Sequence, residues 1–301
     1  MTEHEFTLVD RIQKIKSINE LYDLENNAYI SFSGGKDSTT LHYLIDEALP
    51  GNRIPRLFIN TGIEYKAILK FVRLLAEKDD RFIIWTVEKN IKETLDKVGY
   101  PFKSKEHSHK LALYKNGSRT KSIQKYFREL PDGFNQCPKS LMYQTSDNFT
   151  LNISDRCCYE FKKKPAQAYM KQSGRTITIT GMMKAEGGQR TTLNCIVTDS
   201  KSNKVTKFHP LAIVSTNWED WYITKNRIQL CDLYYPPYNF DRTGCKGCCF
   251  AKDLQAQLDT LESLLPAEKA QCEYLWRPIY EEYRRIGYRL RQDDNQPTLF
   301  D

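Results

Sequence analysis

Hydrophobic and polar positions divide the first part of the chain into short apolar runs separated by stretches with helical spacing. Four β-favouring runs of this kind lie at residues 28–32, 55–60, 81–87 and 176–180. After the first run, apolar residues recur every three or four positions as far as Ala48, and they do so again over residues 65–77. Strands that alternate with helices are typical of a parallel sheet covered on both faces, so the pattern predicts an α/β fold.

The two ends of the chain carry helical patterns. Residues 1–27 combine charged positions with apolar residues at helical spacing, which predicts a leading helix. From residue 251 to residue 292 the pattern is mostly helical, with breaks expected at Pro266 and Pro278. The polar residues 293–301 are expected to fray.

Length and composition narrow the class of protein. The 301 residues suffice for a large α/β core with an appendage, so we expect a catalytic domain over residues 1–250 and a helical subdomain with a tail over 251–301. The sequence has no run of about 18 apolar residues, and Met1–Asp10 lacks the apolar centre of a secretory signal, so the expected location is the cytoplasm, without a membrane. Nine cysteines in a reducing compartment indicate metal, cluster or catalytic roles rather than disulfides. The net charge of +7 permits a polyanionic partner without requiring one.

The loop after the first apolar run, Ser33-Gly34-Gly35-Lys36-Asp37-Ser38, is the strongest candidate for chemistry. Its two glycines let the backbone approach an anion closely, and the helix that follows directs free N–H groups and its positive end toward the loop. The second strand ends in Asn60-Thr61-Gly62, and ligands of parallel sheets gather at the carboxyl ends of strands. The sequence therefore predicts a phosphate site there, although an ordinary tight turn with a helix cap uses the same residue types.

A basic segment lies between residues 103 and 128. It holds eight lysine or arginine residues and one acid, Glu106, with Tyr114, Tyr126 and Phe127 interleaved. Such a segment is either a solvated helical face or a surface that follows nucleic-acid phosphates while its aromatic residues stack on exposed bases. Both interpretations stay open at this point.

Several cysteines are spaced as ligands would be. Cys157 and Cys158 are adjacent, a C-x-x-C-C segment spans Cys245–Cys249, and Cys195 stands alone. Four soft thiolates in two distant pairs suit an iron–sulfur cluster or tetrahedral zinc, and spacing alone does not separate these. The alternative for Cys157 and Cys158 is that they are small buried apolar residues.

These motifs follow one another in the order of a known family. They are Ser33–Ser38, Asn60–Gly62, Cys157-Cys158-x-x-Phe161-Lys162-x-x-Pro165, Ile179–Glu186, His209–Ala212 with Trp218–Asp220, and Tyr238-Asn239 before Gly244-Cys245-x-x-Cys248. The loop resembles the PP-loop of ATP pyrophosphatases, and the whole series resembles the phosphoadenosine and adenosine phosphosulfate (PAPS and APS) reductase family. The resemblance implies a parallel-sheet sandwich of the adenine nucleotide alpha hydrolase-like type, with a helical, cysteine-cluster-bearing C-terminal part.

Site residues follow from this resemblance. Lys36 and Asp37 would be catalytic toward ATP with Mg²⁺, and the carboxylates of Asp37 and Glu64 can help to hold that ion. The residues expected at the nucleotide are Ser31, Ser33, Gly34, Gly35, Lys36, Asp37, Ser38, Asn60, Thr61, Gly62, Gly181 and Arg190. In family members with a double cysteine and a later C-x-x-C, the four thiolates hold a [4Fe-4S] cluster. The corresponding ligands are Cys157, Cys158, Cys245 and Cys248, with Cys195 or Cys249 as substitutes and zinc as the alternative metal.

Two departures from the reductases favour another branch of the superfamily. The reductases act through a Cys-Gly segment near the C-terminus, whereas the last cysteine here is Cys272 within Gln-Cys-Glu. In addition, Phe161 stands where reductases usually place an arginine. The ATP pyrophosphatases of DNA phosphorothioation systems (DndC and SspD types) keep the PP-loop and the cluster cysteines but do not reduce sulfate.

The predicted function is an ATP pyrophosphatase that activates an acceptor by adenylation for sulfur transfer, with DNA phosphorothioate modification as the first choice. The alternatives are tRNA thiolation, sulfonucleotide reduction and a zinc-bearing regulator that binds nucleic acid without turnover. The resemblance implies a cysteine desulfurase as sulfur donor. Nucleic acid, with DNA preferred to tRNA, and other proteins of a modification system are the remaining expected partners.

Overall fold

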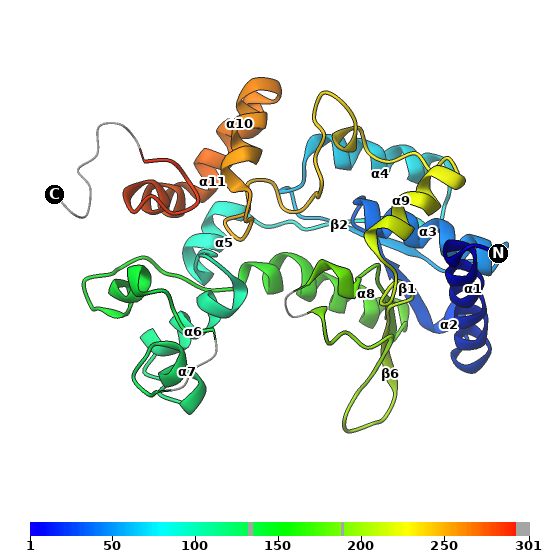
Figure 1. Ribbon diagram of the computed structural model, residues 1–301, viewed down its shortest axis with the longest axis horizontal. Helices are drawn as coiled ribbons and strands as arrows, with labels where there is room; N and C mark the ends of the chain where they lie inside the picture. The colour runs from blue at the N-terminus through cyan, green and yellow to red at the C-terminus, as the bar shows by residue number, and fades with distance from the viewer. Residues whose placement is uncertain (132–134, 188–189, 293–301) are drawn as a thin grey trace. The chain divides into compact units, whose positions relative to one another are not determined.

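The computed structural model describes residues 1–131, 135–187 and 190–292, and Figure 1 traces the chain. The chain forms two compact units, each assembled from two separate stretches of sequence. The sheet unit comprises Met1–Val87 and Pro165–Gly244, and the helical unit comprises Glu88–Lys164 and Cys245–Asp301. The predicted division at residues 250 and 251 stays a prediction, and the predicted fraying of residues 293–301 lies outside the described residues.

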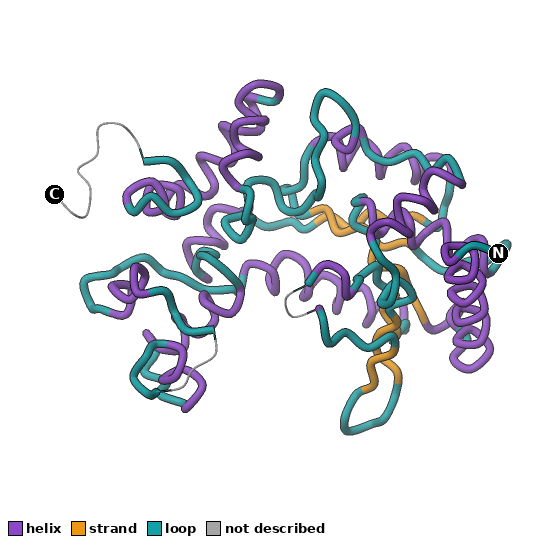
Figure 2. The backbone as a smooth tube through the Cα atoms, viewed as in Figure 1, coloured by secondary structure: helices purple, strands orange, loops and turns teal. Residues whose placement is uncertain are grey.

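The sheet unit is built on six strands in the order β3-β2-β1-β4-β6-β5, drawn in orange in Figure 2. The strands are β1 Ala28–Ser31, β2 Arg56–Asn60, β3 Phe82–Thr86, β4 Ile177–Ile179, β5 Ile196–Thr198 and β6 Val205–Phe208. Neighbouring strands pair in parallel except β5, which runs antiparallel to β6. The predicted α/β class with a mainly parallel sheet is therefore confirmed, and β1 to β4 coincide with the four apolar runs.

Helices of the sheet unit fill the connections between these strands. They are α1 Glu3–Tyr22, α2 Leu24–Asn27, α3 Lys36–Ala48, α4 Lys66–Lys78, α8 Lys164–Ser173 and α9 Thr216–Lys225, with short 3-10 turns η3 Lys184–Glu186 and η5 Asp232–Tyr234. The leading helix and the helices after β1 and β2 are confirmed by α1, α3 and α4. The β5–β6 hairpin was not predicted, because each of its strands is short and carries threonine or lysine among its apolar residues.

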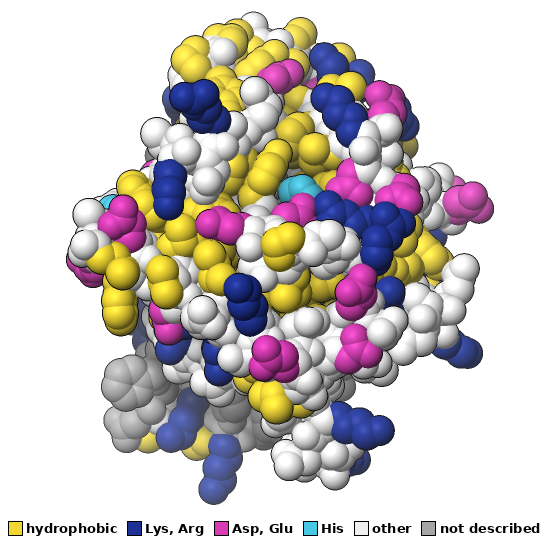
Figure 3. Space-filling view, turned by 90° about the vertical axis from the view of Figure 1, so that its right-hand side faces the viewer, with side chains coloured by type: hydrophobic (Ala, Val, Ile, Leu, Met, Phe, Trp, Pro, Cys, Tyr) yellow, Lys and Arg dark blue, Asp and Glu magenta, His cyan; other side chains and the backbone are white. Residues whose placement is uncertain are grey.

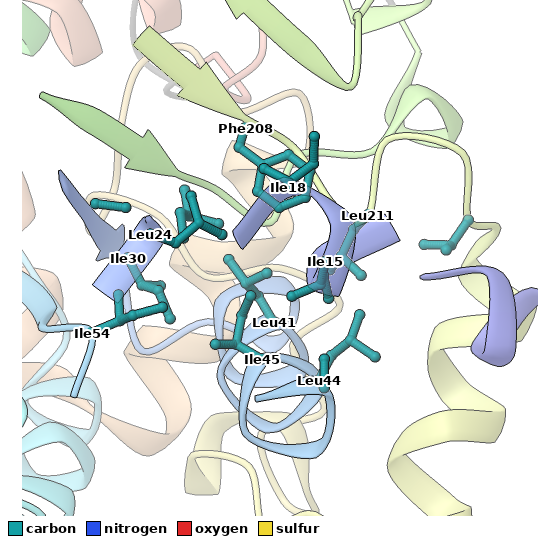
Figure 4. Close-up of a cluster of buried hydrophobic side chains, with 14 of the residues drawn as sticks. Ile15, Ile18, Leu24, Ile30, Leu41, Leu44, Ile45, Ile54, Phe208 and Leu211 are labelled. Atoms are coloured by element: carbon teal, nitrogen blue, oxygen red, sulfur yellow. The ribbon is translucent and has the colours of Figure 1, made fainter. Parts of the chain in front are cut away.

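Alternate residues of β1 enter two different cores. Ile30 packs on one face with Ile15 of α1 and Leu41 of α3, in the cluster shown in Figure 4. Tyr29, one position earlier, packs on the opposite face against Tyr169 of α8. Burying each such apolar side chain contributes about 1.5–3 kcal/mol, so this alternation fixes β1, and with it the loop that follows, between two layers of helices.

The helical unit is held together by aromatic packing around its C-terminal helices. Its elements are α5 Ile91–Val98, α6 Lys105–Lys115, α7 Lys121–Tyr126, η1 Lys139–Thr145, the π-helical turn η2 Tyr159–Lys163, α10 Leu254–Leu264 and α11 Pro266–Arg285. Phe102 lies edge-on to Tyr283 with ring centroids 4.6 Å apart. The basic segment contributes to this packing rather than only covering it, since Tyr126 and Phe127 are 2% and 1% exposed.

The predicted helix break at Pro278 is wrong, whereas the break at Pro266 is confirmed. Pro266 stands in the first turn of α11, where no intrahelical N–H bond is lost. Pro278 lies inside α11, which continues to Arg285. The neighbouring side chains Trp276 and Ile279 are 1% and 0% exposed, so burial of the helix face offsets the hydrogen bond that Pro278 cannot make.

Apolar side chains on the surface are scattered among charged ones. Figure 3 shows one face of the molecule, on which basic and acidic side chains lie beside one another between apolar residues. Single exposed apolar residues such as Phe6 and Tyr274 are normal for folded proteins. None of the helices within residues 1–131, 135–187 and 190–292 has the length and apolarity that a membrane span requires.

Candidate active site

The loop between β1 and α3 leaves no room for side chains on its glycines. Gly34 has a φ of +73°, and a Cβ atom placed on it would lie 2.9 Å from Ile68 Cγ2. Gly35 is the N-cap of α3, and a Cβ atom there would lie 3.0 Å from Thr243 Oγ1. Glycine is therefore required at both positions, because the backbone itself forms the surface of the loop.

Hydroxyl groups fix the loop without capping the helix. Ser33 N donates to Ser38 Oγ at 3.2 Å, and the two serine oxygens lie 3.0 Å apart. Ser38 and Thr39 each donate to the Gly35 carbonyl oxygen at 2.9 Å. No side chain caps α3 at Gly35. The first-turn amides thus face the loop, the arrangement that favours an anion.

Two distant segments close around this turn. A Cβ atom on Gly181, just after β4, would lie 2.6 Å from the Asp37 carbonyl oxygen, so the backbone after β4 packs directly on the start of α3. From the other side, Lys36 N donates to Tyr234 Oη at 2.9 Å, and Tyr234 Oη lies 2.7 Å from Thr243 Oγ1. Gly181 therefore helps to position the loop by its lack of a side chain.

The Lys36 ammonium group is held by two carboxylates of α9. Lys36 Nζ lies 3.1 Å from Asp220 Oδ1 and 3.6 Å from Glu219 Oε2. Partial burial alone would lower the pKa of Lys36, but Asp220, Glu219 and Asp37 together outweigh it and raise that pKa. A permanent cation is therefore fixed beside the loop.

Glu219 is a buried carboxyl group with unused hydrogen-bonding capacity. The residue is 0% exposed, and its two carboxylate oxygens and Thr40 Oγ1 have no hydrogen-bond partner by geometry within the described parts of the chain. Burial and then the charge of Asp37 raise the pKa of Glu219 to about 7, while Lys36 and the nearby Thr40 hydroxyl oppose this rise. Unsatisfied buried oxygens are costly, so this site retains capacity to accept a ligand.

Asp37 stands between basic and acidic neighbours. Burial raises the pKa of Asp37, and the charges of Arg242 and Lys36 act against that rise. Arg242 forms an ion pair with Glu186, and so does Arg190, which the sequence predicts at the nucleotide. The structure therefore places Arg190 against Glu186 and brings Arg242 into the surroundings of Asp37.

The end of β2 is a tight turn stabilised by its own side chains. Thr61 donates to Glu64 through its amide at 2.9 Å and through its hydroxyl at 2.7 Å. Asn60 Oδ1 accepts from the amide of Gly62, which has a φ of +81°. The carboxylate of Glu64 therefore accepts hydrogen bonds within the turn. Ser31 is the last residue of β1 and is exposed.

The helical unit brings together the sulfur atoms of two distant segments. Cys157 is hydrogen-bonded to Cys158 and lies close enough to Cys245 and Cys248 for their charges to raise its pKa. The charge of Cys158 also raises the pKa of Cys248. The nine cysteines form no disulfide. Within the described parts of the chain, no group of three or more His, Cys, Asp or Glu side chains has the geometry of a metal site.

The four cysteines differ in acidity. The hydrogen bond from Cys157 and the charges of Lys105 and Lys162 outweigh burial and lower the pKa of Cys158 to about 6. Burial raises the pKa of Cys248 to about 12. A thiolate at Cys158 is therefore accessible at neutral pH, as soft-metal coordination requires.

Cys195 lies in the sheet unit, whereas Cys249 lies beside Cys248 in the helical unit. Cys195 packs against the core of the sheet unit, just before β5. Cys249 is 0% exposed, and its carbonyl oxygen accepts a hydrogen bond from Tyr283 Oη at 2.9 Å. Trp276 Nε1 and Tyr280 Oη similarly donate to the carbonyl oxygens of Lys246 and Gly247. Helix α11 therefore holds the C-x-x-C-C segment by its backbone.

Sequence reasoning missed the residues that surround Lys36 from outside the loop. Glu219 and Asp220 lie in a motif noted in the sequence, but their acidic side chains received no role there. The motifs noted in the sequence include neither Tyr234 nor Thr243. The acidic pair is marked as polar by its place in a helix after the His209–Ala212 motif, but this local signal does not place it beside Lys36.

A family model and one curated protein match the sequence of this chain. A family model for the phosphoadenosine phosphosulfate reductase domain matches residues 27–134 and 135–251. An uncharacterised protein of Methanocaldococcus jannaschii is 35% identical over 103 residues, which are 31% of this chain and 25% of that protein. The chain thus spans about a quarter of the length of this curated relative.

Several solved structures are similar to parts of this chain at low sequence identity. Phosphoadenylyl-sulfate reductase from Candida auris, in a phosphate complex, is 17% identical over 74% of this chain and 82% of its own, with a TM-score of 0.42. FMN adenylyltransferase from Candida glabrata, with FMN and the ATP analogue AMPCPP, is 11% identical over 77% of this chain and 60% of its own, with a TM-score of 0.44. NH3-dependent NAD synthetase from Campylobacter jejuni is 15% identical over 92% of this chain and 95% of its own, with a TM-score of 0.37.

The family model covers well over half of the chain, and it includes the loop after β1 as well as both cysteine segments. The chain therefore belongs to the phosphoadenosine phosphosulfate reductase domain family.

Proposed function

We propose that the protein is an ATP pyrophosphatase that adenylates an acceptor and so prepares it for sulfur transfer. The observation that carries the proposal is the start of α3, where an uncapped glycine loop stands beside the Lys36 cation and the buried acid Glu219. The backbone amides at the start of α3 and a fixed cation suit the phosphates of a nucleotide, and the acid beside them suits the metal ion that accompanies ATP.

In this reaction an oxygen atom of the acceptor attacks the α-phosphorus of ATP. The bond from that phosphorus to the bridging oxygen breaks, and pyrophosphate leaves with the electron pair. Lys36 and the amides of Gly34 and Gly35 stabilise the charge that the pyrophosphate gains. Sulfur from a donor then attacks the acceptor atom that carries the adenylated oxygen. The bond from this atom to that oxygen breaks, and AMP leaves with the oxygen and the electron pair.

ATP and its metal must rearrange the contacts of Lys36. Its Nζ atom is 3.1 Å from Asp220, so the phosphates take the place of that exposed carboxylate. Mg²⁺ would supply positive charge that offsets the charge of the phosphate oxygens. Asp37 and Glu219 fit it better than Glu64. Among the described residues, the oxygens of Glu219 accept no hydrogen bond and face only the Lys36 cation, whereas those of Glu64 accept hydrogen bonds from Thr61.

The cysteine group in the helical unit fits a sulfur-ligated metal centre. Cys157, Cys158, Cys245 and Cys248 act on one another electrostatically, and the lowered pKa of Cys158 favours the thiolate form. A [4Fe-4S] cluster at these residues would supply a site for sulfur or electron transfer, and zinc would supply structural support.

The acceptor in this proposal is nucleic acid, with DNA phosphorothioation of the DndC or SspD type as the first choice and tRNA thiolation as the second. A cysteine desulfurase would supply the sulfur, and other proteins of a modification system would supply the recognition of the acceptor. Basic residues of the helical unit support a polyanionic acceptor, because they outnumber acidic residues in the segment from residue 103 to residue 128.

Family membership favours a second candidate, the reduction of a sulfonucleotide. The placement of Cys272 argues against it. Cys272 is 0% exposed inside α11, and its Sγ atom would lie 2.7 Å from a Cβ atom placed on Gly247. A thiol packed in this way does not reach a sulfonucleotide without unpacking the helix.

The first test measures which bond of ATP is cut. The purified full chain is incubated with ATP, Mg²⁺ and single-stranded oligonucleotides, and AMP, ADP, pyrophosphate and phosphate are quantified. We expect AMP and pyrophosphate, with at least about a 100-fold loss in Lys36→Ala, as is typical when a group that stabilises a leaving charge is removed. The matched control is Lys16→Ala, which removes an exposed lysine of α1.

Three outcomes would contradict the proposal. ADP with phosphate would indicate cleavage between the β and γ phosphates. Binding of ATP without any product would favour the zinc-bearing regulator. Sulfite formed from a sulfonucleotide and a thiol reductant would establish the reductase instead.

A further inference from the structure

We propose that two adjoining cavities of the helical unit bind an unpaired stretch of a polynucleotide, with its phosphates on lysine and arginine residues and a base against Tyr159 beside Cys158. This inference rests on the proposed function, because it identifies where the nucleic-acid acceptor docks. It is argued from cavity shape, charge and exposed apolar surface within residues 88–164.

The first cavity opens beside Cys158. Its volume is about 440 Å³, and its wall includes Lys105 and His109 of α6 together with Arg156 and Lys163. Cavities of this size are in the range that binds small ligands or single nucleotide units. A ligand in this cavity therefore reaches one of the four clustered thiols directly.

The second cavity adjoins the first. Its volume is about 630 Å³, and it shares Ala112, Asn116, Ser154 and Arg156 with the first cavity. The shared residues make Arg156 a common wall of both. A ligand longer than one nucleotide can thus pass from one cavity into the other.

The combined lining is strongly basic. Its lysine and arginine residues are Lys89, Lys97, Lys105, Arg156, Lys163 and Lys164. Two acids face them. Glu160 pairs with Lys89 at 2.7 Å and lies within 4.0 Å of both Lys164 and Arg156, and Asp155 lies 3.4 Å from His109. Positive charge therefore exceeds negative charge along the whole lining, as a path for several phosphates requires.

Apolar surface lies inside the basic rim of the first cavity. Tyr159 and Leu113 line it and are 39% and 37% exposed, which is high for large apolar side chains. An aromatic ring among cations is the arrangement with which proteins stack a base while holding the backbone on either side. A free inorganic anion would use the cations but not this apolar surface.

The shape selects a single strand over a duplex. A base reaches the ring of Tyr159 only when it is unpaired, because the stacked bases of a duplex are not available to a side chain inside a cavity. Two of the three aromatic residues that the sequence suggested for this role do not serve it. Tyr126 and Phe127 are buried in the core of the helical unit, so stacking moves from them to Tyr159.

The test measures binding of labelled oligonucleotides to the full chain by fluorescence anisotropy, over a series of salt concentrations and without ATP. We expect single-stranded DNA or RNA of about 12 nucleotides to bind, within the site sizes common for such proteins. The variant Arg156→Ala with Lys163→Ala is expected to weaken binding at least about tenfold and to reduce the slope of log K against log salt by about 1.4, for two lost phosphate contacts. Both side chains are exposed, so the fold tolerates their removal.

Base stacking is tested separately. Tyr159→Ala is expected to weaken binding by about 5- to 100-fold with the salt slope unchanged, and Tyr159→Phe is expected to restore it. The matched control is Lys252→Ala with Arg277→Ala, which removes an exposed lysine and an exposed arginine of the helical unit that do not line either cavity.

Three results would overturn the proposal: equal losses in the cavity and control variants, equal affinity for duplex and single strand, or Tyr159→Ala without effect. Each of these results leaves the cleavage of ATP untouched. Failure of the docking site is therefore distinguishable from failure of the proposed function.

Discussion

The sheet unit and the helical unit hold their charged groups in opposite ways. In the sheet unit the cation of Lys36 is already neutralised by Asp220 and Glu219, so a ligand must displace existing contacts. In the helical unit cations outnumber acids around Cys158, so a polyanion can form new ion pairs there while displacing fewer existing ones. The difference suits the two proposals: selection of a nucleotide with its metal ion at the first site, and attraction of a long anion by net charge at the second.

The largest effect is expected where backbone packing builds the first site. Gly181→Ala would place a methyl group 2.6 Å from the Asp37 carbonyl oxygen, so the start of α3 has to shift. We expect release of pyrophosphate from ATP to fall at least about 100-fold, because a displacement of about 1 Å at a catalytic group has that consequence. Oligonucleotide binding should remain unchanged, since it belongs to the helical unit.

Gly244→Ala is the matched control for this substitution. A Cβ atom at Gly244 meets no heavy atom within 4 Å, and its backbone is not in the left-handed region. Similar losses in both variants would show that the close approach of Gly181 to α3 does not matter. Circular dichroism confirms that both variants are folded.

The next effect concerns metal in the helical unit. Cys248→Ala is expected to remove most bound iron or zinc from protein purified without oxygen, because one of four thiolates is lost. Metal content and absorption in the visible range measure the loss. Cys195→Ala, in the sheet unit, should retain the metal. Equal metal content in the two variants would contradict the assignment of the ligands.

A smaller effect separates the two carboxylates at Lys36. Glu219→Gln is expected to raise the Mg²⁺ concentration needed for half-maximal ATP turnover by at least about tenfold, since it removes a buried anionic ligand. Asp220 is 60% exposed at its side chain, so Asp220→Asn should change turnover less than about threefold. Initial rates over a Mg²⁺ titration measure both. A larger effect from Asp220→Asn would reverse the roles given to these residues.

The sequence predicted those parts of the molecule that depend on residues close together in the chain. β1 to β4 and the helices around them follow from apolar periodicity, and the glycine loop follows from six consecutive residues. Glu219, Tyr234 and Thr243 could not be found in this way, because their distance from Lys36 depends on how α9 and the segment after it pack on α3. No local pattern encodes that packing.

The same limit applied to the helical unit. Pro278 predicted a break because its local effect on a helix is unfavourable, yet burial of Trp276 and Ile279 outweighed that effect. The aromatic residues of the basic segment indicated base stacking, but Tyr126 and Phe127 form core instead. Burial of a residue is decided by the whole fold, and a short charged segment does not reveal it.

The last prediction concerns stability in acid and compares one buried histidine from each unit. His107 of the helical unit is 0% exposed, with Nδ1 3.0 Å from Tyr126 Oη and Nε2 2.8 Å from Gln144 Oε1. Burial lowers the pKa of His107 from 6.5 to about 4, with Gln144 opposing the change and Lys103 adding to it. In the sheet unit, burial and Arg56 lower the pKa of His42 to about 4 as well.

Between pH 6.5 and pH 4 the unfolded chain binds a proton at His107 that the folded chain does not. The free energy of unfolding is therefore highest above pH 6.5 and falls by up to about 3 kcal/mol as the pH drops toward 4. Urea unfolding at several pH values measures this, and Trp276 reports the helical unit because the three other tryptophans lie in the sheet unit. His107→Gln should reduce the change with pH in the free energy of unfolding that Trp276 reports. The pH dependence of the free energy of unfolding of the sheet unit should stay the same. A variant that keeps the wild-type slope at Trp276 would show that another group controls the acid response of the helical unit.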